Sequence, residues 1–425
     1  MPAGDSHCQD NAKGSESVNL ARIFHESVNL GWNPMIIEPK IRNNICVTAH
    51  PLGCAAQVKA QINYVKARDS IESPKKVLVI GASNGYGLAA RIVSTFSSTA
   101  STIGVAYERP GTKSKTGTAG WYNIESFRKE ANKAGYQAWN INGDAFSQEI
   151  KSQVLDIIRE NLGEIEFLIY SIAAPRRMDP HTGEIYSTVI KPIGNKFTSK
   201  TVDFLSGKVS EISAEPATEE EIANTVKVMG GEDWRLWIEL LQNSGVLAKN
   251  FLTIAFSYIG PDFTKAIYRD GSIGKAKEDL ENSADQINEV LAPRGGKAII
   301  SVNKALVTRA SAVIPAVPLY ISLLYKVMKE KNLHEGCIHQ IYRLYHDFLF
   351  TDSSPTLDDK GRIRIDDWEM RQDVQKEVAE LWQQVTTENL SHLADIDGLR
   401  QEFLRHHGFG MPGVEYSRDV EPDIF

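Results

Sequence analysis

A tyrosine and a lysine nine residues apart, Tyr268 and Lys277, are the side chains best suited to acid–base chemistry. A tyrosine can polarise and protonate a carbonyl oxygen during a reduction, and a nearby ammonium would lower its pKa from about 10. Nine positions along one straight helix turn through about 900°, which puts the two side chains on opposite faces. They converge only if Tyr268 precedes the helix, and we expect Asp270 or Ser272 to be its N-cap. Lys275 is the alternative lysine.

A glycine-rich turn, residues 81–87, is the second feature with chemical meaning. It follows a short apolar run and precedes a helical pattern that begins at Leu88. The glycines would let the backbone turn tightly against a pyrophosphate, and the N-terminus of the next helix offers free N–H groups and a positive dipole end. The spacing G-x-x-x-G-x-G differs from the G-x-G-x-x-G form of many dehydrogenases, so the prediction depends on the flanking strand and helix.

Polar and small residues follow the next three predicted strands. Glu108 comes 21 residues after Gly87, where an acidic side chain would bind the adenosine ribose hydroxyls and repel a 2′-phosphate, which favours NAD(H). Arg109 leaves a preference for the 2′-phosphorylated cofactor open, because its guanidinium could bind the 2′-phosphate. Residues 144–145 would meet the adenine, and residues 172–173 would let the backbone pass close to a ribose. All these positions lie at carboxyl ends of strands, where ligands bind in open α/β sheets.

Strands and helices alternate from residue 76 onward, which predicts an α/β fold. Helical patterns lie between most of the strand candidates, as in a Rossmann-like, doubly wound parallel sheet that is covered on both faces. The strand candidates are residues 77–80, 102–107, 138–141, 167–171, 252–257 and 297–302.

The chain divides into a polar leader and one large domain. Residues 1–34 are polar, contain Glu-Ser-Val-Asn-Leu twice and are expected to lie outside the fold. Residues 35–425 are expected to form a single domain. Within it we predict a strand pair, a turn at 51–53 and a helix at 55–67 in residues 35–75, a Rossmann-like core at 76–310 with a surface insertion near 176–225 that has a hairpin at 190–197, and a helical C-terminal extension at 311–425.

Composition narrows the class of protein. Hydrophobic residues make up 42% of the chain and charged residues 24%, so a substantial core is expected. The net charge of −7 argues against a general nucleic-acid-binding protein. The most apolar run, 310–328, is interrupted by Ser311, Pro315 and Lys326, so we expect no stable membrane insertion. The four cysteines, at 8, 46, 54 and 337, indicate neither a disulfide framework nor a metal site, which favours a reduced, cytoplasmic location.

Two further clusters resemble metal sites without matching them. His334 and His339 are separated by one residue too many for the HExxH motif, which needs both imidazoles on one helical face. The acidic and basic stretch 358–367 lacks the ligand spacing of an EF-hand. We therefore expect no bound metal, and we interpret 358–367 as a solvated hairpin or the approach to a helix.

Five longer motifs extend these observations along the chain: IEPK at 37–40, GASNGYG at 81–87, SYIG at 257–260, IYRDGSIGKAK at 267–277 and SVNKALVT at 301–308. With them the chain resembles the FabV-type enoyl-[acyl-carrier-protein] reductases and trans-2-enoyl-CoA reductases, which are large relatives of the short-chain dehydrogenases. The resemblance runs from about residue 35 to the C-terminus. One departure is Glu278, because members of this family often have a second lysine after the one that matches Lys277.

The resemblance implies NAD(H) as the cofactor and a role for each matching residue. Tyr268 would be the proton donor, Lys277 would bind the nicotinamide ribose, and Tyr258 would contact the substrate thioester. The residues that would contact the cofactor are Gly81, Ala82, Ser83, Asn84, Gly85 and Tyr86 at the pyrophosphate, Tyr107 and Glu108 at the adenosine ribose, Asp144 and Ala145 at the adenine, Ile172 and Ala173 on the ribose side, and Leu306, Val307 and Thr308 after the last predicted strand.

The reaction that the resemblance implies is the NADH-dependent reduction of the trans-2 double bond of an enoyl thioester in fatty acid biosynthesis, with coenzyme A or an acyl carrier protein as the carrier. The run 310–324 would line the acyl chain, and the five basic residues between 176 and 200 could form a rim for an acidic carrier. One alternative is a ketoreductase acting on a 3-oxoacyl thioester, although its usual Tyr-x3-Lys spacing is absent. Another is a non-catalytic NAD(H)-sensing protein. A monomer is expected, with a dimer as the alternative.

Overall fold

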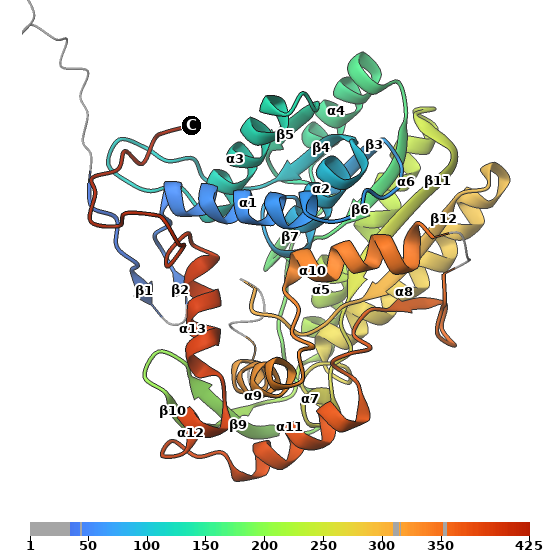
Figure 1. Cartoon of the computed structure of the whole chain (residues 1–425). Helices are drawn as coiled ribbons and strands as arrows, with labels where there is room; N and C mark the ends of the chain where they lie inside the picture. The colour runs from blue at the N-terminus through green and yellow to red at the C-terminus, as the bar shows by residue number, and fades with distance from the viewer. Residues whose placement is uncertain (1–34, 43–44, 309–313, 315, 352–354) are drawn as a thin grey trace, which may run out of the picture.

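The centre of the protein is a seven-stranded sheet in which every neighbouring pair of strands is parallel (Figure 1). The structure is a computed structural model that describes residues 35–42, 45–308, 314, 316–351 and 355–425, and the predicted leader at 1–34 lies outside these residues. The predicted α/β class with a doubly wound parallel sheet is confirmed. In spatial order the strands are β13 (Arg362–Arg364), β12 (Lys297–Val302), β11 (Leu247–Ser257), β6 (Ile165–Tyr170), β3 (Lys76–Ile80), β4 (Ser101–Ala106) and β5 (Ala138–Asn142).

All six predicted strands are present, but the sheet has one strand more. The unpredicted strand is β13, so the interpretation of 358–367 as a solvated hairpin or helix approach is wrong. Ile363 is fully buried there. Its neighbour Arg362 forms ion pairs with Asp358 and with Glu281 on the adjacent helix. Tertiary contacts, rather than a local hydrophobic pattern, therefore stabilise this three-residue strand.

Helices cover both faces of the sheet. Val77 and Val79 pack into one hydrophobic cluster, while Leu78 and Ile80 pack into another, because successive side chains of a strand point to opposite faces. The first face is covered by α1 (Pro51–Lys66), α2 (Gly85–Ser98), α3 (Ala119–Lys133) and α10 (Cys337–Arg343), and the second by α4 (Gln148–Ile157), α6 (Glu232–Asn243) and α8 (Ser272–Leu291).

The segment before the core contains the predicted strand pair, β1 (Ile41–Arg42) and β2 (Ile45–Cys46). The predicted turn at 51–53 is wrong, because these residues form the first turn of α1. The His50 side chain caps the helix by accepting a hydrogen bond from the Gly53 N–H at 3.2 Å. Pro51 fits the first helical position, where its missing N–H needs no partner.

The insertion near 176–225 contains two antiparallel hairpins, β7 (Arg176–Met178) with β8 (Ile185–Ser187) and β9 (Phe197–Asp203) with β10 (Lys208–Ala214). The predicted hairpin at 190–197 is wrong, because most of this segment connects the two. Pro192 has no N–H for a ladder. The Lys191 N–H instead donates to Ser272 Oγ at the start of α8, at 3.2 Å. Helix α5 (Glu219–Met229) completes the insertion.

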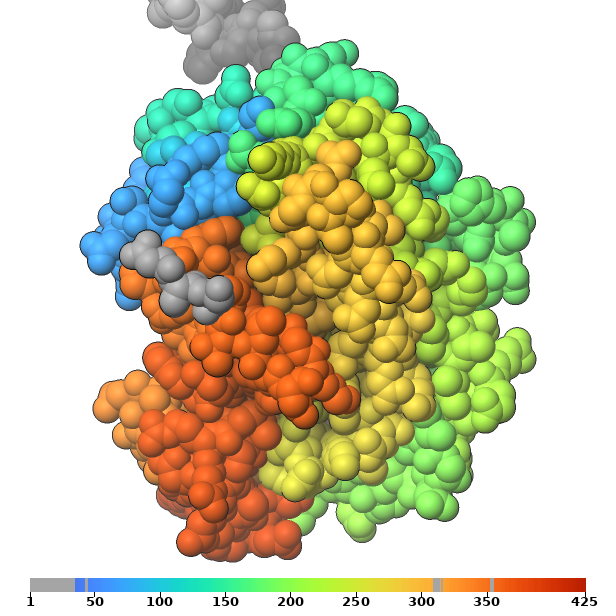
Figure 2. Space-filling view, turned by 90° about the vertical axis from the view of Figure 1, so that its right-hand side faces the viewer, coloured from blue at the N-terminus to red at the C-terminus, as the bar shows by residue number. Residues whose placement is uncertain are grey.

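The C-terminal region adds a helical lobe at one end of the sheet. Figure 1 shows α9 (Val317–Glu330), α11 (Gln372–Gln384), α12 (Leu390–Leu393) and α13 (Ile396–Arg405) gathered with the β9–β10 hairpin and α7 (Asp262–Lys265). Figure 2 shows the orange C-terminal segment lying against the yellow surface of α8. In the part of the chain that the structure describes, no helix is both long and apolar enough to span a bilayer.

Candidate active site

The glycine turn between β3 and α2 packs closely against neighbouring backbone. Gly81 has a φ of +90°, and a Cβ there would lie 2.1 Å from the Ser171 carbonyl oxygen. A Cβ on Gly87 would lie 2.0 Å from the Gly81 carbonyl oxygen, so both positions require glycine. The N-cap residue Asn84 accepts a hydrogen bond from Asn123 Nδ2 at 2.8 Å instead of capping α2. The first N–H groups of α2 are thus directed at the turn, which fits a dinucleotide pyrophosphate.

Glu108 lies beside this turn, just beyond the end of β4. Its Oε1 accepts hydrogen bonds from Ser83 Oγ at 2.7 Å and Asn84 Nδ2 at 3.4 Å. A Cβ on Gly120 would lie 2.2 Å from the same oxygen, so the start of α3 packs closely against the carboxylate. The neighbouring Tyr107 is 79% exposed. The structure therefore brings the acidic side chain, but not its aromatic neighbour, into contact with the turn.

The two other predicted loop positions lie along the same edge of the sheet. Asp144 follows β5 and accepts a hydrogen bond from the Phe146 N–H at 3.0 Å, while Ala145 is buried. Ile172 and Ala173 follow β6, directly after the residue that packs against the glycine turn. All four residues lie at carboxyl ends of parallel strands, where ligands bind in this class of fold.

The loop that follows β12, residues 303–308, also reaches the start of α2. The Tyr86 hydroxyl donates to the Lys304 carbonyl at 2.8 Å, so its side chain ties α2 to this loop. Thr308 Cγ2 lies 3.9 Å from the position that a Cβ of Gly85 would take. Leu306, Val307 and Thr308 are thereby brought next to the glycine turn, although more than 200 residues separate them in sequence.

Tyr268 precedes α8, as the convergence with Lys277 requires, since the helix begins at Ser272. The N-cap is Gly271, so the expected cap at Asp270 or Ser272 is wrong. The Ser272 hydroxyl instead donates to a backbone carbonyl of the preceding insertion at 2.6 Å.

Of the two candidate lysines, Lys277 faces the interior. Its ammonium donates to the Phe256 carbonyl at 3.1 Å, and burial lowers its pKa to about 8. Lys275 pairs with Glu278 on the surface, at 2.9 Å. Burial raises the pKa of Tyr268, which is the opposite of the lowering expected from a neighbouring ammonium. Burial of the phenol is thus the cause of the raised pKa of Tyr268.

Tyr258 and Tyr268 meet inside one hydrophobic cluster. Their ring centroids are 5.0 Å apart at an interplanar angle of 72°. The cluster also contains Leu306, Val307 and much of α9. The two tyrosines and the loop after β12 thus lie against one apolar region of the protein.

Polar side chains of the C-terminal lobe hold this loop, and none was predicted from the sequence. Glu369 Oε2 accepts the Ala305 N–H at 2.6 Å. The Val307 N–H donates to the Tyr325 hydroxyl at 3.2 Å, and the Val307 carbonyl contacts His406 Nε2 at 2.7 Å. These partners lie 18 to 99 residues from the loop residues that they contact, and no sequence motif links them.

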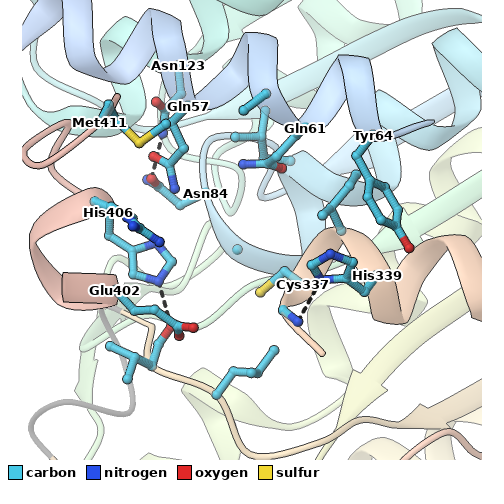
Figure 3. A pocket seen from close by; sticks show the side chains of 18 of the residues that line it. Gln57, Gln61, Tyr64, Asn84, Asn123, Cys337, His339, Glu402, His406 and Met411 are labelled. Atoms are coloured by element: carbon cyan, nitrogen blue, oxygen red, sulfur yellow. Dashed lines mark hydrogen bonds between the residues drawn. The ribbon is translucent and has the colours of Figure 1, made fainter. Parts of the chain in front are cut away.

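A cavity of about 430 Å³ opens at the start of α2 (Figure 3). Asn84 and Gly85 form part of its wall, together with Leu306 and Val307. Figure 3 shows side chains from helices that are far apart in sequence around it. They include Gln57, Gln61 and Tyr64 from α1, Asn123 from α3, Cys337 and His339 from α10, Glu402 from α13, and His406 directly after α13. The cavity therefore adjoins the glycine turn and the loop after β12.

The histidines of the near-miss metal motif have structural partners. His334 Nε2 contacts Glu402 Oε1 at 3.1 Å, and His339 Nδ1 accepts the Gly336 N–H at 2.8 Å. Among the described residues no group of three or more His, Cys, Asp or Glu side chains could hold a metal ion.

The five basic residues proposed as a rim for an acidic carrier are mostly engaged. Arg177 is buried against a glutamate, and Lys191 and Lys196 each form an ion pair. Lys200 donates to three backbone carbonyls of the C-terminal lobe. Arg176 is exposed. Three of the five cations thus pair with acids and a fourth donates to carbonyls, so the basic rim for an acidic carrier stays a prediction.

Three family models match consecutive parts of the chain. Residues 36–113 match the NAD(P)H binding domain of trans-2-enoyl-CoA reductase, and residues 115–350 match the trans-2-enoyl-CoA reductase catalytic region. Residues 357–420 match a model described as an enoyl reductase FAD binding domain.

Similar proteins cover nearly the whole chain. An enoyl-[acyl-carrier-protein] reductase [NADH] of Flavobacterium johnsoniae is 57% identical over 91% of this chain and 98% of its own length. A trans-2-enoyl-CoA reductase [NADH] of Clostridium perfringens is 54% identical over 91% of this chain and 99% of its own. The crystal structure of Treponema denticola trans-2-enoyl-CoA reductase in complex with NAD is similar, with a TM-score of 0.89, 50% identity and coverage of 91% of this chain and 98% of that one.

The described residues of 357–420 do not fit the flavin that the third model's description names. Asp373 and Asp397 lie in the first turns of α11 and α13, where a negative charge disfavours a pyrophosphate. The buried carboxylate of Glu369 and the partly buried carboxylate of Glu402 accept hydrogen bonds from tyrosines of the same lobe. We therefore assign no step to a flavin.

Proposed function

The chain belongs to the trans-2-enoyl-CoA reductase family, and from that premise we propose that it reduces the trans-2 double bond of enoyl thioesters with NADH, giving saturated acyl thioesters for fatty acid biosynthesis. The observation that carries the proposal is the convergence of the glycine turn 81–87, the loop 303–308 and the pair Tyr258 and Tyr268 at one edge of the sheet. We propose that residues 35–425 form a single functional domain, because the glycine turn and the loop 303–308 are both held by contacts with parts of the chain that are distant in sequence.

NADH is the proposed cofactor, and its phosphates would lie against residues 81–86 at the start of α2. The Glu108 carboxylate, held by Ser83, supports NADH over NADPH because it would bind ribose hydroxyls and repel a 2′-phosphate. Lys277 would hold the nicotinamide ribose with its ammonium. The remaining predicted contacts are Tyr107, Asp144, Ala145, Ile172, Ala173, Leu306, Val307 and Thr308.

The cofactor supplies a hydride to the β-carbon of the enoyl thioester. Tyr268 donates a hydrogen bond to the thioester oxygen as negative charge develops on it, and Tyr258 helps to position that oxygen. Protonation of the α-carbon completes the saturated product. The burial of Tyr268 and the partial burial of Tyr258 strengthen these electrostatic contacts, because the surrounding apolar side chains screen them little.

The position of helix α9 supports the proposal that this region binds the acyl chain of the substrate. Its residues from Val317 to Leu324 are buried in the cluster that contains Tyr268, although the part of the predicted acyl wall at 310–313 and 315 lies outside the described residues. We propose that the thioester is carried by coenzyme A or an acyl carrier protein and that the protein acts as a monomer.

NADH absorbance at 340 nm tests the function directly. With crotonyl-CoA the absorbance should fall, while acetoacetyl-CoA, the substrate of the ketoreductase alternative, should leave it unchanged, and NADPH should be the poorer reductant. Consumption with acetoacetyl-CoA alone would establish the ketoreductase. NADH binding without consumption across enoyl-CoA chain lengths would support the sensor.

A further inference from the structure

Glu369 is a fully buried carboxylate in the turn between β13 and α11. Its Oε1 accepts hydrogen bonds from the Tyr258 hydroxyl at 3.2 Å and the Tyr320 hydroxyl at 2.5 Å. Its Oε2 accepts the Ala305 N–H at 2.6 Å. One carboxylate thus accepts three hydrogen bonds. The donors are the hydroxyl of Tyr258, which we propose binds the substrate, the hydroxyl of Tyr320 on α9, and the N–H of Ala305 in the loop after β12.

Burial of a carboxylate is costly unless the charge is compensated. Burial raises the pKa of Glu369, while the charge of the nearby Lys304 and the hydrogen bonds from Tyr320 and Ala305 act in the opposite direction. The Lys304 ammonium donates to the Ala305 carbonyl at 3.0 Å, so it is itself held at the loop. Because burying a carboxylate costs free energy, we infer that Glu369 has a role besides packing in the core.

The hydrogen bond to Glu369 determines what the Tyr258 hydroxyl can do. A phenol has a single proton to donate, and here the carboxylate accepts it. The Tyr258 oxygen can still accept a hydrogen bond, but it donates to a thioester oxygen only if its proton rotates away from Glu369. Before the reaction the Tyr258 proton is therefore already donated to Glu369, and Tyr258 differs from Tyr268 in this respect.

We propose, on the basis of the function proposed above, that Glu369 is a positioning residue that holds the Tyr258 hydroxyl and the loop after β12 in register for the enoyl thioester. When the Tyr258 proton turns toward the thioester oxygen, Glu369 keeps Tyr320 and Ala305 as donors. Because these two hydrogen bonds remain, the buried negative charge of Glu369 still has donors when the Tyr258 hydroxyl rotates away from it. The same group thereby links the substrate-contacting tyrosine to the loop that carries Leu306 and Val307.

A double-mutant cycle of Glu369→Gln and Tyr258→Phe tests the proposal. The amide keeps the size of Glu369 but loses one acceptor, so kcat with saturating NADH and crotonyl-CoA should fall about tenfold, because the Tyr258 hydroxyl loses its charged acceptor. In the Tyr258→Phe background, Glu369→Gln should lower kcat by less than about twofold, because the hydroxyl that Glu369 positions is absent. Effects that multiply fully would overturn the proposal.

Tyr320→Phe keeps the test available if Glu369→Gln fails to fold. This change removes one donor from the same carboxylate oxygen without touching Tyr258. We expect a smaller loss of kcat than for Glu369→Gln and no further loss in the Tyr258→Phe background. Equal proportional losses in both backgrounds would show that Tyr320 and Glu369 act only through stability, which thermal unfolding of each variant would register separately.

Failure of the inference differs from failure of the proposed function. If the unmodified protein does not oxidise NADH with any enoyl thioester, the function is wrong and the cycle cannot be run. If it does so and Tyr258→Phe and Glu369→Gln both leave kcat unchanged, the function stands and the role of Glu369 is refuted.

Discussion

The rings of Tyr258 and Tyr268 meet edge to face, with centroids 5.0 Å apart, although one follows β11 and the other precedes α8. Burial raises the pKa of both hydroxyls, so both are protonated at neutral pH. Tyr258 donates its proton to Glu369. The Tyr268 hydroxyl is therefore the one we expect to meet the substrate oxygen first.

Tyr268→Phe should lower kcat with crotonyl-CoA by about 100-fold or more, because a positioned proton donor typically contributes 10²–10⁴-fold. The NADH dissociation constant, measured by fluorescence titration, should change less than about twofold. Tyr186→Phe is a matched control, since that hydroxyl contacts Glu184 on an outlying hairpin. Full activity of the Tyr268 variant would remove it from the mechanism.

Replacement of Glu108 should weaken the preference for NADH. In Glu108→Ser the carboxylate that would repel a 2′-phosphate is lost, and the exposed Arg109 next to it remains. We expect kcat/KM for NADH to fall and the NADH-to-NADPH ratio of kcat/KM to drop about tenfold, which corresponds to about 1.4 kcal/mol. An unchanged ratio would show that another residue selects the cofactor.

The affinity for NADH should depend on pH through Lys277. Burial lowers the pKa of this ammonium to about 8, so the charged form that would bind the ribose is complete below that pH and is lost above it. The NADH dissociation constant should be constant from pH 6 to 7 and should increase from about pH 8 upward. Lys277→Arg, which stays charged, should bind NADH more weakly but without this dependence. A flat profile for the unmodified protein would contradict the assignment.

Glu402 should stabilise the fold in a pH-dependent manner. Burial alone would raise its pKa, but hydrogen bonds from His334 and Tyr325 outweigh burial and lower the pKa to about 2. A depressed carboxyl pKa contributes stability above the unfolded value of about 4.3, and this contribution is lost as pH falls toward 2. Glu402→Gln should therefore lower the free energy of unfolding by up to about 3 kcal/mol at pH 7.

The comparison of unfolding curves between pH 7 and pH 3 tests this contribution. The difference between the unmodified protein and Glu402→Gln should shrink below about pH 4.5. Glu380→Gln, a change at an exposed position of α11, should have little effect at any pH. A difference for Glu402→Gln that stays constant down to pH 3 would contradict the account.

The sheet and the cofactor half of the site are predictable because local patterns specify them. Short segments rich in apolar residues mark six of the seven strands, and Gly81 and Gly87 are required because a Cβ there would collide with backbone. β13 escaped prediction because Arg362 and Arg364 flank a single buried Ile363. The strand is stabilised by pairing with β12 and by the ion pair of Arg362 with the distant Glu281.

The second half of the site depends on tertiary contacts. Glu369 lies 111 residues from Tyr258, and His406 lies 99 residues from Val307. Each belongs to a segment that reads as an ordinary polar turn or helix face. Their function becomes visible only when the C-terminal lobe packs against the loop after β12.

Transfer of a label from the cofactor tests the central claim most directly. NADH deuterated at both C4 positions should reduce crotonyl-CoA to butyryl-CoA with one deuterium on the β-carbon and none on the α-carbon, as read by mass spectrometry and NMR. The same reaction with ordinary NADH in D₂O should place one deuterium on the α-carbon. A label from NADH on the α-carbon, or NADH oxidation without a saturated product, would contradict the account.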